Sequence, residues 1–431
     1  MFRKRIQLGL IHVAVAMTLV PINSTLNRVM IKELALSATL VAALASLPYF
    51  FSPLQVWIGG HSDRHPILGY RRTPYIVIGI LLCVAGVIIS PQVAFLMADN
   101  LWLGILIGLL AFGAWGMGYN FATVSYLALA SELSGEKGRG KTVAVMWVMM
   151  IISIIATAIL ISRMVDPYTP AAMARAFWTV GLVALALGLL GLLRLEPRAT
   201  GPRRAAEEYT WGQMARAILN NRQVTIFFVY LLLLLAALLG QDILLEPFAA
   251  EAFEMPVKVT TRITAIWGGA TLAAMVIAGI LEGRVDKRMV AQTGNLGALA
   301  GFLLITVSGL VASRGAFYAG VTLLGIGTGL STIANLSLML DMTTAESIGL
   351  FIGAWGMASA LSRLAGSLLA GAVRDLVTQA LGDKVLGYTV VFGIEALMLL
   401  AAVALFYRID VAAFRRKAEE MPLMERAAAA D

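Results

Sequence analysis

Residues 60–75 read GHSDRHPILGYRRTPY in a chain of which 59% is hydrophobic and only 13% is charged. The stretch holds two histidines, an aspartate, three arginines and two prolines, and apolar runs flank it on both sides. Such a contrast predicts a polar loop between two apolar segments. The loop therefore marks where its two neighbours end.

Apolar runs of the length that crosses a bilayer, roughly 20 residues, recur along the 431 residues. The mean hydropathy is +0.84, and the charged fraction is about half that of an ordinary soluble protein. Continuous apolar runs exclude a membrane β-barrel, which needs alternating polar and apolar positions. The sequence predicts an all-α membrane protein. Basic residues that orient its helices explain the net charge of +8 better than a nucleic-acid partner does.

Twelve transmembrane helices are predicted, so both ends of the chain lie on one side of the membrane. Most of the 33 lysines and arginines fall in the two ends and in the loops on their side. By the positive-inside rule both termini are cytoplasmic, as is the 60–75 loop. The predicted spans are about 7–27, 38–59, 74–95, 101–130, 141–162, 175–195, 223–245, 259–281, 289–311, 315–340, 348–373 and 386–407.

The longest polar stretch separates the sixth and seventh spans and divides the chain into two halves. In the first half Glu132 precedes Trp147 by 15 positions, and in the second half Asp341 precedes Trp355 by 14 positions. Such internal repeats are typical of transporters built from two pseudo-symmetric bundles. The predicted domains are a six-helix bundle at 1–195, a cytoplasmic linker at 196–222, a second six-helix bundle at 223–408 and a cytoplasmic tail at 409–431.

Two six-helix halves joined by a basic linker are the organisation of the major facilitator superfamily. The loop between its second and third helices has the form G-x-x-x-D-R/K-…-R-R, which residues 59–72 follow with a short insertion. The chain further resembles the PucC/LhaA-type bacteriochlorophyll-delivery family of that superfamily. Four segments carry this resemblance: TLNRVMI (25–31), RRTPY (71–75), QDILLEP (241–247) and FIGAWG (351–356).

The resemblance implies a non-enzymatic membrane factor for the assembly of light-harvesting complexes, which binds, delivers or transports bacteriochlorophyll or chlorophyll. The pigment would be cargo, with no nucleotide or metal cofactor. Expected partners are antenna polypeptides, pigment-synthesis enzymes and membrane lipid, in a photosynthetic inner or intracytoplasmic membrane. Two alternatives stay open. One is a proton-coupled facilitator of a small amphipathic solute that uses Asp242 or Glu246, and the other is a static scaffold for antenna assembly.

The resemblance suggests a cytoplasmic gate in the polar loop. A carboxylate such as Asp63 can pair with neighbouring arginines or with a helix N-terminus, and so hold one conformation closed. The other interpretation is a solvated turn whose arginines only fix the topology. The gate candidates are Asp63, Arg64, Arg71, Arg72, Glu132 and Asp341.

A second set of polar residues is expected at the central cavity or at a periplasmic gate. Ionisable groups within spans are costly and therefore indicate functional positions. Arg28 is predicted to pair with Asp242 or Glu246, or alternatively to anchor at the lipid headgroups. The candidates are Asn27, Arg28, Gln241, Asp242 and Glu246.

Histidine and aromatic side chains provide candidates for a pigment path, although core packing explains each of them as well. The path candidates are His12, Trp115, Tyr119, Trp147 and Trp355. For His61 and His65, Pro66 and Gly69 argue against the helix that would align them, so no metal site is predicted. The glycine clusters at 113–118 and 325–329 lie in apolar runs, which favours helix packing over nucleotide binding.

Overall fold

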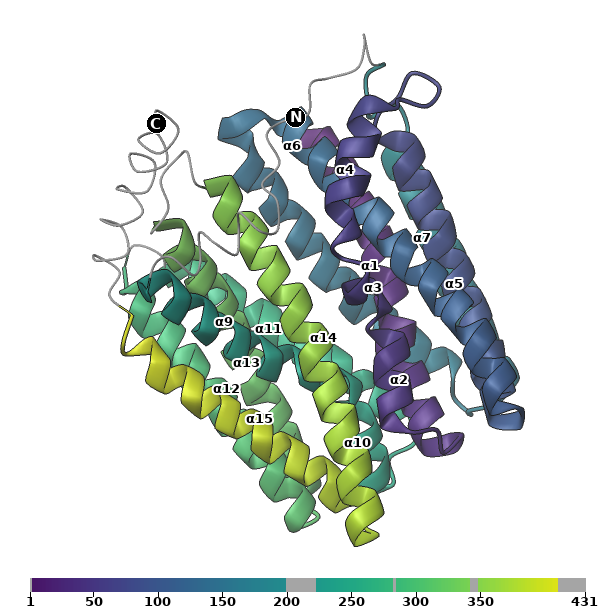
Figure 1. The fold of residues 1–431 in the computed structure, drawn as a ribbon, viewed down its shortest axis with the longest axis vertical. Helices are drawn as coiled ribbons and strands as arrows, with labels where there is room; N and C mark the ends of the chain where they lie inside the picture. Colours follow the sequence, from purple (N-terminus) through teal and green to yellow (C-terminus); the bar gives the residue numbers. More distant parts are fainter. Residues whose placement is uncertain (1, 199–221, 282–283, 342–347, 410–431) are drawn as a thin grey trace, which may run out of the picture. The chain divides into compact units, whose positions relative to one another are not determined.

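The computed structural model describes residues 2–198, 222–281, 284–341 and 348–409, which are mostly helical (Figure 1). The described helices are α1 (Phe2–Val20), η1 (Pro21–Leu26), η2 (Val29–Glu33), α2 (Ala38–Ala45), α3 (Leu47–Phe50), α4 (Leu54–Arg64), α5 (Thr73–Asp99), α6 (Leu101–Met164), α7 (Pro170–Leu192), α9 (Arg222–Gly240), η3 (Gln241–Ile243), α10 (Leu245–Phe253), α11 (Val257–Leu281), α12 (Lys287–Leu310), α13 (Arg314–Asp341), α14 (Ile348–Leu381) and α15 (Lys384–Phe406). No strand occurs in these ranges.

Eleven helical segments of the described chain are long and apolar enough to cross a membrane. Two of them belong to α6, which bends at Gly135, where φ is 63° and ψ is 173°. The predicted second span, 38–59, is absent from the eleven because it is divided among α2, α3 and α4, each only a few turns long. The eleven segments and this divided one correspond to the twelve predicted spans.

Prolines divide the second span. Pro48 lies at the start of α3 and Pro53 directly before α4, and proline lacks the N–H that would continue a helix. Asn120 of α6 provides a hydrogen-bond donor at this break: its Nδ2 donates to the Pro48 carbonyl at 2.8 Å. Gln55 in turn donates to Asn120 Oδ1 at 2.5 Å. The sequence prediction of one continuous helix here is wrong, although both prolines are visible in the sequence.

The chain forms two compact units. Unit 1 comprises Met1–Glu207, Asp242–Gly269 and Ser367–Tyr388. Unit 2 comprises Glu208–Gln241, Ala270–Gly366 and Thr389–Asp431. The predicted boundary in the linker stays a prediction, because residues 199–221 lie outside the described part of the chain.

Small residues let the helices of each unit approach closely. In unit 1, α5 packs along α6 and α7, and α1 packs against the same two helices (Figure 1). A Cβ atom on Gly118 would lie 2.6 Å from the Gly79 carbonyl oxygen, so α5 and α6 touch backbone to backbone there. In unit 2, a Cβ on Gly327 of α13 would lie 2.3 Å from the Ala298 nitrogen of α12. Both glycine clusters thus serve helix packing, as predicted.

The first span is longer than predicted and changes its winding. It continues from α1 through η1 and η2, which are π-helical, to Glu33. π-Helical turns are rare and occur frequently at functional sites. Arg28 lies inside this span instead of at its end, and its side chain is buried. The alternative of an arginine anchored at the lipid headgroups is therefore wrong.

Candidate functional site

Arg72, directly before α5, is the buried centre of an ion-pair network in unit 1. Its Nη2 donates to Asp63 Oδ1 at 2.5 Å and to Glu132 Oε1 at 3.0 Å. Its Nη1 donates to Ser62 Oγ at 2.5 Å and is 3.5 Å from the Gly59 carbonyl oxygen. We call these five residues the Arg72 cluster. They connect α4, the start of α5 and the middle of α6.

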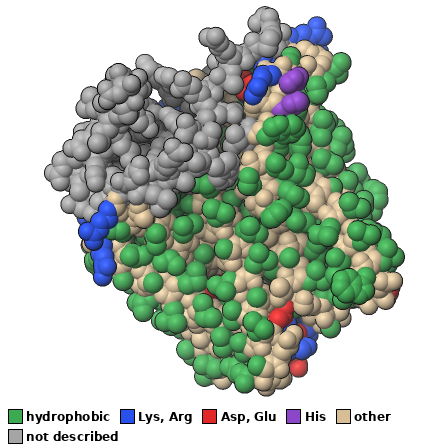
Figure 2. Space-filling view, in the orientation of Figure 1, with side chains coloured by type: hydrophobic (Ala, Val, Ile, Leu, Met, Phe, Trp, Pro, Cys, Tyr) green, Lys and Arg blue, Asp and Glu red, His purple; other side chains and the backbone are tan. Residues whose placement is uncertain are grey.

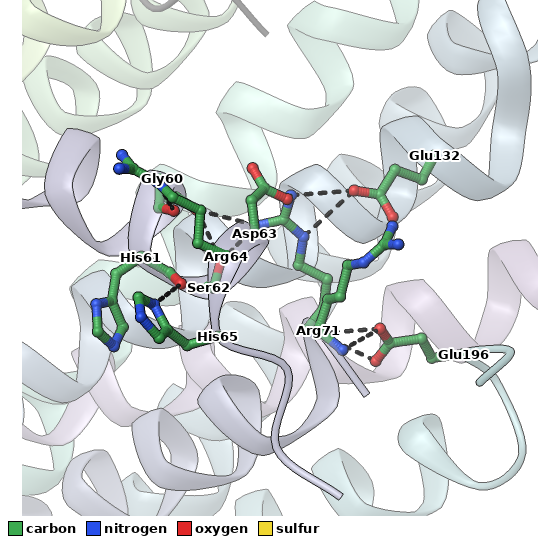
Figure 3. Close-up of polar contacts among 11 residues, drawn as sticks. Gly60, His61, Ser62, Asp63, Arg64, His65, Arg71, Glu132 and Glu196 are labelled. Carbon is green, nitrogen blue, oxygen red and sulfur yellow. Dashed lines mark hydrogen bonds and ion pairs between the residues drawn. The ribbon is translucent and has the colours of Figure 1, made fainter. Parts of the chain in front are cut away.

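The carboxylate of Glu196 binds the backbone at the N-terminus of α5, next to the Arg72 cluster. It accepts hydrogen bonds from the backbone N–H groups of Arg71 at 2.8 Å, Arg72 at 3.0 Å and Thr73 at 2.6 Å (Figure 3). A negative charge at a helix N-terminus satisfies unpaired donors and opposes the positive end of the helix dipole. Glu196 therefore caps α5 and holds the chain that follows α7 against it.

The predicted pairing of Asp63 with an arginine is confirmed, and Arg72 is that arginine. Glu132 joins them, as its place among the candidates anticipated. Arg64 is exposed, and its hydrogen bond among the described residues is to the Gly60 carbonyl, at 3.2 Å. The side chain of Asp341 lies outside the described residues. One guanidinium shared by two carboxylates holds the end of α4, the start of α5 and the middle of α6 together, and would release them if the charges separated.

Sequence reasoning missed Glu196. The acidic residue comes directly before Pro197, at the end of the sixth span, where it appeared to be only the first residue of the linker. Its sequence position shows no link to the 60–75 loop, because the two are brought together only by the packing of α7 against α5.

On the first span, Arg28 has partners other than the predicted ones. Its Nη1 donates to Glu33 Oε1, and its Nη2 donates to the Met255 carbonyl at 3.2 Å. In this conformation these hydrogen bonds go to Glu33 and Met255 instead of Asp242 or Glu246, although the charge of Arg28 still acts on the Glu246 carboxyl group. A gate between Arg28 and Asp242 or Glu246 stays a prediction. Five residues separate Arg28 from Glu33, a spacing that the i→i+5 winding of η2 brings together.

The same end of unit 1 carries further polar contacts between segments distant in sequence. Lys32 pairs with Glu251 at 3.2 Å. Tyr168, in the loop before α7, lies close enough to respond to Glu33: burial raises the pKa of the Tyr168 hydroxyl, the Glu33 carboxylate raises it further, and Arg28 opposes both. Polar groups from three parts of the chain thus gather at this end of unit 1.

Glu246 is buried on α10 and is held by hydroxyl groups. Its Oε1 accepts from Ser24 of η1 and, at 2.7 Å, from Thr264 of α11. Thr25 and Thr261 share a hydrogen bond of 3.2 Å beside them. The structure therefore brings the first span and Glu246 together as predicted, through hydroxyls instead of an arginine.

The other candidates of this group are Asn27, Gln241 and Asp242. Asn27 is buried and its Nδ2 donates to the Asn23 carbonyl at 3.1 Å, within its own helix. Gln241 is buried in unit 2, with its Nε2 3.4 Å from the Leu238 carbonyl. Asp242 lies on η3, where the seventh span loses its regular winding between α9 and α10. Their roles in a gate stay predictions.

Asp375 of α14 forms a contact that sequence reasoning also missed. Its carboxylate accepts from the backbone N–H groups of Ala38 at 3.1 Å and Thr39 at 2.8 Å, and from Thr39 Oγ1 at 2.7 Å. It thereby caps α2. Arg374 bonds Asp375 at 2.9 Å, and its guanidinium lies 4.8 Å from the ring centre of Tyr388.

The candidates for a pigment path do not share one environment. Trp115 is fully buried and donates to Thr18 Oγ1 at 3.3 Å, so in this conformation it is part of the core. His12 is buried against Tyr126, with ring centres 5.1 Å apart. Tyr119 lies edge-on to Tyr49, Trp147 is 40% exposed, and Trp355 belongs to unit 2. The path stays a prediction.

The histidines of the polar loop are aligned, contrary to the sequence prediction. Helix α4 continues to Arg64, and His65 is its C-terminal cap residue. The His61 and His65 rings stack with centres 4.2 Å apart, and Trp57 stacks on His61 at 5.0 Å. Pro66 interrupts the helix one residue too late to separate the rings.

Residues 25–414 match the PUCC protein family. The chain belongs to this family. It is 32% identical to Protein PucC of Rhodobacter capsulatus, an alignment that covers 93% of this chain and 90% of that protein. It is 31% identical to Protein PucC of Cereibacter sphaeroides, covering 91% and 89%. It is also 27% identical to the Bacteriochlorophyll synthase 44.5 kDa chain of Rhodobacter capsulatus, covering 92% of each chain.

Solved structures of transporters share the fold. A bacterial homologue of the human lysosomal transporter Spinster superposes with a TM-score of 0.73 at 12% identity, covering 96% of this chain and 97% of that one. The D-xylose-proton symporter gives 0.70 at 14% identity, covering 95% and 97%. The nucleoside transporter NupG gives 0.68 at 15%, covering 94% and 99%. The prediction of an all-α major facilitator fold in a multi-pass membrane protein is confirmed.

Proposed function

We propose that this protein is a membrane factor for the assembly of light-harvesting complexes, which binds bacteriochlorophyll or chlorophyll and delivers it to antenna polypeptides. The observation that carries the proposal is the family match over residues 25–414, together with relatives of nearly the same length. The name of one relative, Bacteriochlorophyll synthase 44.5 kDa chain, connects the family with pigment metabolism. Family and transporter fold both point to a non-enzymatic membrane protein.

The proposed mechanism uses the fold as a carrier for a flat, apolar cargo. Bacteriochlorophyll is too hydrophobic to cross water, so a membrane protein must receive and release it within or beside the bilayer. In this proposal the Arg72 cluster holds the end of α4, the start of α5 and the middle of α6 in one conformation, and separation of its charges permits the other. The protein lies in the photosynthetic membrane with both termini in the cytoplasm. Its partners are antenna polypeptides and, on the supply side, pigment-synthesis enzymes.

The proposal is tested by purifying the tagged protein from its phototrophic host in mild detergent. We expect an absorption spectrum of bound bacteriochlorophyll or chlorophyll, co-purifying antenna polypeptides, and a loss of assembled antenna when the chain is deleted. Antenna polypeptides without pigment would favour a static scaffold.

A proton-coupled facilitator of a small amphipathic solute is the second candidate. The observation in its favour is Glu246, a carboxyl group buried in unit 1 and bonded to two hydroxyls. Proton-driven solute uptake into liposomes by a colourless protein would support it and overturn the assembly role.

A further inference from the structure

The exposed side of α4 carries two stacked histidine rings beside an exposed tryptophan. Leu54, Trp57 and His61 follow one another at i, i+3 and i+7, which places them on one face of the helix, and His65 continues that face at its end. Leu54 is 41% exposed and Trp57 is 61% exposed. Figure 2 shows the histidine patch on the surface, bordered by hydrophobic side chains. We call Trp57, His61 and His65 the histidine stack.

Hydrogen bonding fixes the state of the outer ring. His65 Nδ1 lies 3.1 Å from the His61 carbonyl oxygen (Figure 3), and a carbonyl can only accept, so Nδ1 carries the proton. In the neutral ring the lone pair is then on Nε2, which has no partner among the described residues. A ring nitrogen oriented by a backbone carbonyl through the other nitrogen is the usual arrangement of a metal-ligating histidine.

The neighbours hold this ring in place. The hydroxyl of Tyr75 donates to the His65 carbonyl at 2.8 Å, and the ring of Tyr75 meets His61 edge-on at 6.2 Å. The imidazole of His65 stacks on His61 at an interplanar angle of 19°. The ligand atom is therefore oriented before any metal arrives, which lowers the entropic cost of binding.

A bare metal ion does not fit this site. Stacked rings direct their in-plane lone pairs side by side instead of toward one point, so the pair supplies one ligand at a time. Among the described residues, no group of three or more His, Cys, Asp or Glu side chains is placed to hold a metal ion. A magnesium already held by the four nitrogens of a chlorin macrocycle, in contrast, needs only one axial ligand, and an imidazole provides it.

We propose that His65 Nε2 is the axial ligand of the magnesium in a bacteriochlorophyll or chlorophyll that docks on the histidine stack, with Trp57 and Leu54 as the apolar surface beside it. The inference rests on the proposed function, because that function supplies the pigment as cargo. It assigns a surface site at the end of α4, next to the Arg72 cluster, where Ser62 and Asp63 lie between the two histidines. Docking there would act on the helix end that the cluster holds.

The test uses the full chain in lipid nanodiscs, titrated with bacteriochlorophyll a and with its magnesium-free form. The visible band that responds to magnesium coordination reports the ligand directly. We expect His65→Phe to weaken binding of the magnesium pigment at least about tenfold, while His61→Phe, a matched change one turn away, retains most of it. For His65→Gly, added imidazole should restore the coordination band, a result that a mere folding defect would not give.

Three other outcomes would contradict the proposed site. Equal binding of both pigments by the unaltered chain would show that magnesium is not needed. The pigment would then bind through apolar contacts alone, and axial ligation would be overturned. Magnesium-dependent binding that survives in His65→Phe would overturn this site and leave the proposed function standing. If the unaltered chain binds no pigment while deletion of its gene still abolishes antenna assembly, pigment delivery and this site both fail, and a scaffold remains.

Discussion

At the scale of single residues, the loss of Arg72 would leave two carboxylates without their cation. Its guanidinium is buried between Asp63 and Glu132. We expect Arg72→Ala to lower the free energy of unfolding by about 1–3 kcal/mol, because two partly exposed carboxylates lose their partner. Thermal unfolding in detergent measures the effect. The exposed Arg64 is the control: Arg64→Ala should change the midpoint little, and equal losses in the two variants would contradict the role of the cluster.

The Asp63 carboxylate tests whether the Arg72 cluster matters for antenna assembly as well as for stability. We expect Asp63→Ala to lower the amount of assembled antenna without preventing membrane insertion, because α4 loses its ion pair with Arg72. Membrane fractions and antenna absorption measure both. Normal antenna absorption in this variant would show that the loop only fixes topology.

Glu196 permits a graded test at the N-terminus of α5. Glu196→Gln keeps one acceptor oxygen for the N–H groups of residues 71–73 but removes the charge that opposes the helix dipole. Glu196→Ala removes both. We expect losses of roughly 0.5–1 and 1–2 kcal/mol in unfolding free energy. If the two variants are equal, the charge of Glu196 contributes nothing.

At the scale of elements, the π-helical part of the first span brings Arg28 and Glu33 together. Arg28→Glu puts a carboxylate at a buried position beside the Glu33 carboxylate, and the repulsion should impair antenna assembly. Adding Glu33→Arg exchanges the two charges and should recover part of the antenna assembly. Antenna absorption at matched expression levels measures this. A double variant no better than Arg28→Glu alone would show that Glu33 is not the relevant partner.

The elements also show what the sequence can and cannot predict. The Asp63–Arg72 contact was predictable because the loop holds both residues within nine positions. The partner of Arg28 was not, because η2 is π-helical and no sequence pattern announced that winding. Asp375 was missed for another reason: its cap on α2 depends on two spans far apart in sequence lying side by side. Span number follows from composition, whereas local winding and distant pairing follow from packing.

At the scale of the whole molecule, the distribution of basic residues predicts the orientation. Reporter fusions at Gly201 and Ala427 should both report the cytoplasm, because the linker and the tail are rich in arginine. A fusion at Ser313, between α12 and α13, should report the periplasm. A periplasmic result at Gly201 or Ala427 would contradict the twelve-span topology.

A disulfide between α2 and α14 tests whether the whole molecule alternates between two conformations. Thr39 and Asp375 are bonded through their side chains at 2.7 Å, on the side of the membrane opposite to the termini in the predicted topology. In a chain whose only cysteine, Cys83, is replaced by alanine, Thr39→Cys with Asp375→Cys creates a pair that oxidation can link. A carrier must separate these helices to open on that side, so we expect oxidation to lower antenna assembly several-fold and a reductant to restore it.

The comparison is made within one protein, oxidised against reduced, so the loss of the Asp375 cap affects both samples equally. The single Thr39→Cys variant, treated in the same way, controls for oxidation elsewhere in the host. Cross-linking itself is measured by protecting the remaining thiols and labelling after reduction. A static scaffold needs no separation of α2 from α14 and would assemble antenna equally well in both states. That result would remove alternation from the mechanism and leave the protein a fixed docking surface for pigment and polypeptide.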